Sequence, residues 1–160
     1  MSVLANKRRL SRFEVIHHAI ELQKQMREFM QRDFGIKDLH KAARKRFECR
    51  IDTYCDFEKY NYLLQTHKRN IDYNMSMLVE KVRFANSIRP RLYTEYELRR
   101  NYQNEALAFC DVIVGELQEV VETFAVDINK FEPYIKGINR EIDLIKGWRQ
   151  KDNRFKTLPR

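Results

Sequence analysis

The chain has 160 residues, of which 43% are apolar and 34% charged, a balance typical of one folded domain with a buried core rather than a disordered protein. Four glycines and three prolines are too few for the tight turns of a β-sandwich or barrel, so the composition favours a few long helices. The formal net charge of +8 favours polyanionic partners such as RNA, DNA or an acidic membrane, although an ordinary basic protein without a specific ligand has the same total.

The first predicted elements are a basic arm and a helix. Residues 1–10 form the arm, and Ser11–Glu14 matches a capping box that starts a helix over about residues 12–33. Apolar residues recur along it at helical spacing, and Gly35 is the expected C-cap. Residues 36–56 break this pattern and are rich in lysine and arginine. We expect them to form a basic connector.

Three further helices are expected. The second covers about residues 57–87, with an apolar stripe that stops before Pro90. Thr94–Glu97 matches another capping box, at the start of a helix over 94–124. The last helix covers 128–149, and residues 127–132 form a single turn or a kinked first turn, because Pro133 cannot lie deep inside a helix. Residues 151–160 lack periodicity, which predicts a mobile basic tail.

Together these elements predict an all-α fold. Four amphipathic helices within residues 11–150, joined mostly by short links, indicate an antiparallel up-down-up-down four-helix bundle with a basic connector between helices 1 and 2.

Motifs for catalysis and for metal binding are incomplete or absent in the sequence. A di-iron bundle needs two Glu-x-x-His motifs, and the chain has one, Glu14 to His17. The spacing of Cys49, Cys55 and His67 matches no structural zinc pattern, so we expect His67 to be a hydrogen-bonded boundary residue. There is no Gly-x-Ser-x-Gly motif, P-loop or dinucleotide-binding fingerprint. We therefore expect no enzyme activity, no metal and no cofactor.

The expected location is the cytoplasm. The N-terminal residues lack the apolar core of a signal peptide, and no window approaches eighteen apolar residues. The three cysteines, an odd number without a CxxC pair, favour a reducing compartment.

The charges are clustered. Basic groups gather in residues 7–12, 37–50, 89–100 and 146–156, whereas the later half of the third helix is acidic. A concentrated basic surface binds nucleic acid by releasing counterions. The predicted nucleic-acid-binding residues are Arg89, Arg91, Arg99, Arg100, Lys146, Arg149, Lys151, Arg44, Lys45 and Arg46. Three tyrosines among them, at positions 93, 96 and 102, either stack on unpaired bases or cap the bundle core.

Several segments carry a family resemblance. They are Ala85–Pro90, Tyr96–Ala106, Met1-Ser2-Val3 with Asn6-Lys7-Arg8, and Gly147–Asp152. With them the chain resembles the accessory variability determinant proteins of diversity-generating retroelements, which are related to the bundle proteins encoded in 23S rRNA intervening sequences. The similarity spans most of the chain and is weakest over residues 36–56.

This resemblance implies a homopentamer with a basic surface that works beside a reverse transcriptase and its template RNA. In that setting the protein is not an enzyme: it assists template-RNA-primed synthesis of mutagenised cDNA. The rival interpretation is an oligomeric structural or regulatory bundle whose basicity serves only solubility. A membrane-surface protein is disfavoured, because its basic residues would line one amphipathic helix rather than cluster at helix ends.

Overall fold

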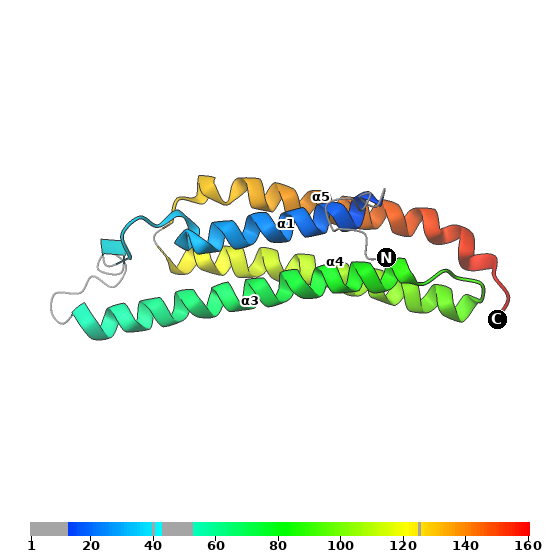
Figure 1. Ribbon diagram of the computed structural model, residues 1–160, viewed down its shortest axis with the longest axis horizontal. Coiled ribbons are helices and arrows are strands. Elements are labelled where there is room, and N and C mark those ends of the chain that lie inside the picture. Colours follow the sequence, from blue (N-terminus) through cyan, green and yellow to red (C-terminus); the bar gives the residue numbers. More distant parts are fainter. Residues whose placement is uncertain (1–12, 40, 43–52, 125) are drawn as a thin grey trace, which may run out of the picture.

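The computed structural model describes residues 13–39, 41–42, 53–124 and 126–160. This part of the chain contains no strand, and the expected all-α fold is confirmed. Four long helices lie lengthwise side by side (Figure 1): α1 (Glu14–Gln31), α3 (Thr53–Ser87), α4 (Tyr93–Thr123) and α5 (Glu132–Lys151). Each begins and ends within four residues of its predicted bounds.

Each helix packs against two others. α1 and α4 both contact α3 and α5, and the α3–α4 interface is the most extensive. The apolar stripe predicted on α3 lies in the core without exposed surface: Tyr60, Leu64, Ile71, Met75, Leu78, Val82 and Ala85. Burying one such leucine or isoleucine side chain contributes roughly 1.5–3 kcal/mol, which explains why this periodicity positions the helix.

Contacts between helix ends give the direction of neighbouring helices. Phe29, near the end of α1, stacks on Tyr134 at the start of α5, with ring centroids 4.2 Å apart. Tyr60, near the start of α3, meets Phe124 just after α4 edge-on at 5.0 Å. In each pair the end of one helix therefore lies beside the start of the other.

The N-caps of α1 and α4 differ from the predicted residues. α1 has Phe13 at its N-cap, and Ser11 lies outside the described residues. α4 starts with Leu92 as N-cap, and the carboxylate of Glu95 accepts the backbone N–H groups of Arg91 and Leu92 at 2.7 and 3.1 Å. The box predicted at Thr94–Glu97 is wrong, because the capping glutamate is Glu95 rather than Glu97. The two N–H groups also hold the pKa of Glu95 below its ordinary value.

The chain leaves α1 through the short 3-10 helix η2 (Asp33–Gly35). The C-cap is Arg32 rather than Gly35, and all three residues of η2 have positive φ angles, 49°, 55° and 80°. A left-handed backbone is strained for the first two, costing about 1 kcal/mol or more each. Phe34 offsets this strain by burying its whole side chain against Phe29 and Phe131.

The predicted mobile tail is ordered in the structure. Asp152–Thr157 form the 3-10 helix η4, which packs against α4 and α5. Asp152 is buried, and the backbone N–H of Tyr93 donates to the carbonyl of Pro159 at 2.8 Å. A 3-10 helix has three residues per turn, so the 3.6-residue pattern that reveals an α-helix is absent from this segment.

Candidate nucleic-acid interface

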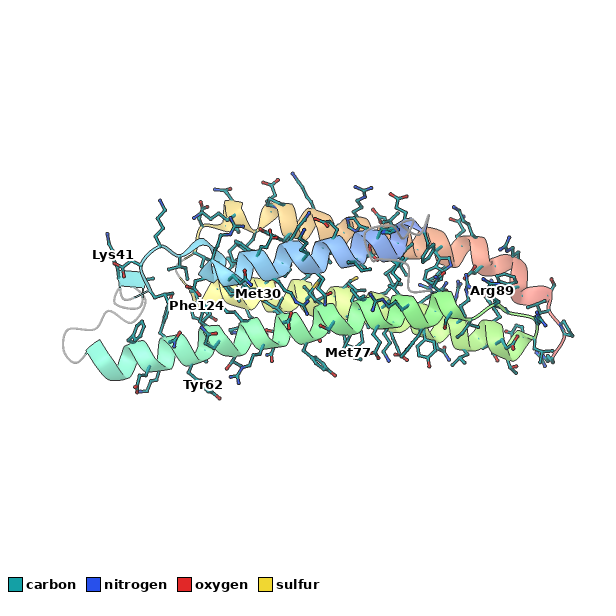
Figure 2. The ribbon with its side chains drawn as sticks, viewed as in Figure 1. Met30, Lys41, Tyr62, Met77, Arg89 and Phe124 are labelled. Carbon is teal, nitrogen blue, oxygen red and sulfur yellow. The ribbon has the colours of Figure 1, made fainter. Side chains whose placement is uncertain are left out.

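One end of the molecule holds almost all of its net charge. Residues 89–100 and 146–160, here called the basic end, contain ten lysines and arginines against three acids, a surplus of +7 out of +8 for the chain. The turn after α3, the start of α4, the end of α5 and η4 meet there. Figure 2 marks this end by Arg89.

Arg99 is part of the scaffold of the basic end. Its Nε and Nη2 donate to the two carboxylate oxygens of Asp152 at 2.7 and 3.0 Å, and its Nη1 donates to the carbonyl of Ile88 at 2.7 Å. The guanidinium also lies 4.9 Å from the centre of the Trp148 ring. Because all three of its guanidinium nitrogens donate within the protein, Arg99 joins α4 to η4.

Arg100 and Arg149 lie together between α4 and α5. Arg100 donates through Nη1 to the carbonyl of Arg149 at 2.7 Å and through Nη2 to Asn153 Oδ1 at 3.3 Å. Its guanidinium carbon is 6.0 Å from the centre of the Tyr96 ring. The side chain of Arg149 is half-buried, and burial, followed by the charge of Arg100, lowers its pKa.

The remaining predicted residues of the basic end are exposed. They are Arg89, Arg91, Lys146 and Lys151. Three exposed cations outside the predicted set lie on the same end: Arg154, Lys156 and Arg160. Their charge is visible in the sequence, but a segment without helical periodicity gives no reason to place them beside α4.

The other basic clusters are not all brought to this end. Arg44, Lys45 and Arg46, like residues 7–12, lie outside the described residues. Lys41, which precedes the first three in the connector, lies at the opposite end of the molecule from Arg89 (Figure 2).

Of the three tyrosines, Tyr96 belongs to the core, with 4% of its surface exposed. Tyr93 is half-buried and packs on the Tyr96 ring and under the guanidinium of Arg160. Tyr102 packs on Phe84. Packing within the bundle thus accounts for all three.

The acidic half of α4 holds His67 of α3 in place. His67 Nδ1 lies 2.9 Å from Glu116 Oε2, and the amide of Asn70 donates to the other oxygen of Glu116 at 3.2 Å. The expectation of a hydrogen-bonded boundary histidine is confirmed. Glu119 lies beside this pair, and the three ligand-type atoms lie within 4.8 Å of one another.

The core contains an ionisable pair that the sequence analysis missed. The Glu-x-x-His motif does not point inward as a unit, since Glu14 is exposed and pairs with Arg140 at 2.9 Å. Instead His18 Nδ1 lies 2.7 Å from Oε2 of Glu141, which has no exposed surface. One signal was available: Glu141 falls on the apolar stripe of α5, between Ile138 and Ile145.

Burial sets the protonation of this pair. It raises the pKa of Glu141 to about 8, and it lowers the pKa of His18, as does the nearby charge of Arg140. Near neutral pH the carboxylic acid of Glu141 therefore stays protonated, and its O–H donates a hydrogen bond to Nδ1 of the neutral imidazole. Burial, followed by the Glu141 charge, also raises the pKa of the Cys110 thiol, which is buried.

The chain was also compared with known proteins. Within the part that the structure describes, no helix has the length of apolar sequence needed to cross a membrane. Comparison with family models, with curated proteins and with solved structures gave no match.

Proposed function

We propose that the chain is a non-catalytic nucleic-acid-binding protein whose binding surface is the basic end. The observation that carries this proposal is the gathering of +7 of the net charge at the junction of α4, α5 and η4. A polyanion bound there displaces counterions from several phosphates at once, which scattered cations do not achieve. Arg89, Arg91, Lys146 and Lys151 are exposed and available for those contacts.

The resemblance stated above extends this proposal to a biological setting. In it, the chain assists the reverse transcriptase of a diversity-generating retroelement in mutagenic cDNA synthesis on a template RNA, in the cytoplasm. The same proposal includes an up-down-up-down bundle and its assembly into a homopentamer. It also includes a second nucleic-acid contact through the basic connector, at Arg44, Lys45 and Arg46. Holding polymerase and RNA on one protein raises their effective concentration. The all-helical fold and the opposed helix ends support it.

The binding test is salt-dependent fluorescence anisotropy with a labelled single-stranded RNA. The variant Arg89→Gln/Arg91→Gln/Lys151→Gln should bind more weakly, and its slope of log affinity against log salt should fall by about 2, since each lost phosphate contact removes roughly 0.7. A matched control neutralises three exposed lysines away from the basic end, at positions 24, 59 and 136. Equal losses in both variants, or no binding by the wild type, would contradict the proposal.

The partner test is a pull-down that retains nucleic acid. We expect a reverse transcriptase among the bound proteins and a template RNA among the sequenced nucleic acids. Recovery of RNA without the polymerase would support binding and contradict the retroelement setting.

A second candidate function is an oligomeric scaffold without nucleic acid. Three large aromatic side chains on α3 favour it, because Tyr62, Tyr73 and Phe84 are 65%, 61% and 43% exposed. Their eleven-residue spacing is close to three helical turns, so they line one outward face. An oligomer that resists Tyr62→Ser/Tyr73→Ser substitution would contradict the use of this face for assembly.

A further inference from the structure

Arg149 carries a positive charge that the described residues do not neutralise. Its Nε atom is shielded from solvent and has no hydrogen-bond partner among them, and its guanidinium forms no ion pair there. The charge beside it is another cation, Arg100. An uncompensated, partly desolvated charge is costly, so this arrangement calls for an anion.

Comparison with Arg99 shows that Arg100 and Arg149 lack an acidic partner among the described residues. Arg99, one residue before Arg100, has a buried carboxylate on two of its nitrogens and a carbonyl on the third. Arg100 and Arg149 have between them only neutral oxygens, the Arg149 carbonyl and Asn153 Oδ1, both accepting from Arg100.

We propose that Arg149 and Arg100 form a seat for one phosphate group, bridging the end of α5 and the start of α4. A tetrahedral phosphate offers several acceptor oxygens, so it can accept from two guanidinium groups at once. Lys146 lies one turn before Arg149 on the same face of α5 and extends the cationic surface beside the seat. The hydrogen bond from Arg100 to the Arg149 backbone fixes the two residues relative to each other.

The identity of this group as a backbone phosphate of nucleic acid rests on the proposed function, whereas the seat itself does not. A phosphate bound at this seat would set the register of a bound nucleic-acid strand on the basic end. The exposed cations would attract the strand without fixing its position.

The first experiment uses inorganic phosphate as the probe. Thermal unfolding of the full chain is followed by circular dichroism in phosphate and in chloride, at matched pH and ionic strength. Phosphate should raise the Tm of the wild type, since at ten times its Kd the folding equilibrium shifts by a factor of about 11. Arg149→Gln should abolish the rise, and the control Lys24→Gln, at an exposed residue away from the basic end, should keep it. Absence of a rise in the wild type, or an equal rise in Arg149→Gln, overturns the seat.

Two readouts separate the seat from a merely structural role. In chloride alone, Arg149→Gln should be as stable as the wild type or more so, because it removes an unpaired charge; a large destabilisation would indicate a structural role and contradict the seat. In the wild type, the Nε–Hε resonance of Arg149 should shift on phosphate titration. A resonance that does not move contradicts the assignment.

The second experiment replaces phosphate by the single-stranded RNA. If wild type and Arg149→Gln respond differently to phosphate but the wild type binds no RNA, the seat stands for free phosphate and the proposed function fails. If the wild type binds RNA while Arg149→Gln matches it in both RNA affinity and phosphate response, the function stands and the seat is refuted.

Discussion

The buried pair of His18 and Glu141 makes the stability of this protein depend on pH in a defined window. The pKa of Glu141 is about 8 in the folded chain, against an ordinary value of 4.5, so between these values the folded state binds one more proton than the unfolded state. Stability then falls as pH rises, by at most about 1.4 kcal/mol per pH unit. The contribution of Glu141 protonation to stability is fully present below pH 4.5 and is lost above pH 8.

His18 acts in the opposite direction at lower pH. Its pKa is lowered from 6.5, so below that value the folded state binds fewer protons and its contribution to stability increases with pH. The unfolded histidine is still half protonated at pH 6.5, so its contribution offsets part of the Glu141 trend until about pH 7.5, above which Glu141 alone determines it. We therefore expect the wild type to lose about 1 kcal/mol of unfolding free energy between pH 6.5 and 8.

The assay is urea denaturation at both pH values, followed by the fluorescence of the single tryptophan, Trp148, which is buried in α5. Glu141→Gln should lose less than a quarter as much stability over the window, because it has no proton to release. The exposed carboxylate of Asp143, on the same helix, supplies the control Asp143→Asn, which should follow the wild type. A Glu141→Gln variant with the full wild-type loss would refute the assignment of the pH dependence to Glu141.

Three further predictions concern stability, each measured as a free energy of unfolding in urea. Asp152→Asn should cost about 3 kcal/mol by leaving the guanidinium of Arg99 without its buried partner; a loss below 1 kcal/mol would show that the pair contributes little. Gly137→Ala should cost about 1 kcal/mol, because the added Cβ would lie 2.7 Å from Cδ1 of the buried Leu22. Gly115→Ala, where the added Cβ meets nothing within 4 Å, should instead stabilise α4 by about 0.5–1 kcal/mol, and a loss there would contradict the packing described.

The four helices could be predicted from the sequence because each one buries a stripe of apolar side chains. Ile71, Met75 and Leu78 recur at the helical period, so burying them together needs no information from elsewhere in the chain. Local sequence pattern alone does not locate the N-cap of α4, since Glu95 and Glu97 both stand where a capping glutamate is plausible. The backbone path before the helix selects Glu95.

The basic clusters were equally visible in the sequence, but their roles were not. Net charge and its uneven distribution follow from composition and order, because every lysine and arginine counts wherever it lies. Whether an arginine is available for a ligand depends on what the fold places beside it. Arg99 and Arg100 are neighbours in sequence, yet the first is neutralised by Asp152 and the second lies against another arginine.

The sequence by itself therefore determined the all-helical class, the extent of the helices and the surplus of positive charge, which depend on local periodicity and composition. The tertiary structure alone decided that η4 folds back on α4 and that Glu141 faces His18 across 123 positions of sequence. It also decided that, within the described part of the chain, no carboxylate pairs with Arg149. Such pairings follow from the relative rotation and offset of packed helices, which many side chains set together and no single segment encodes.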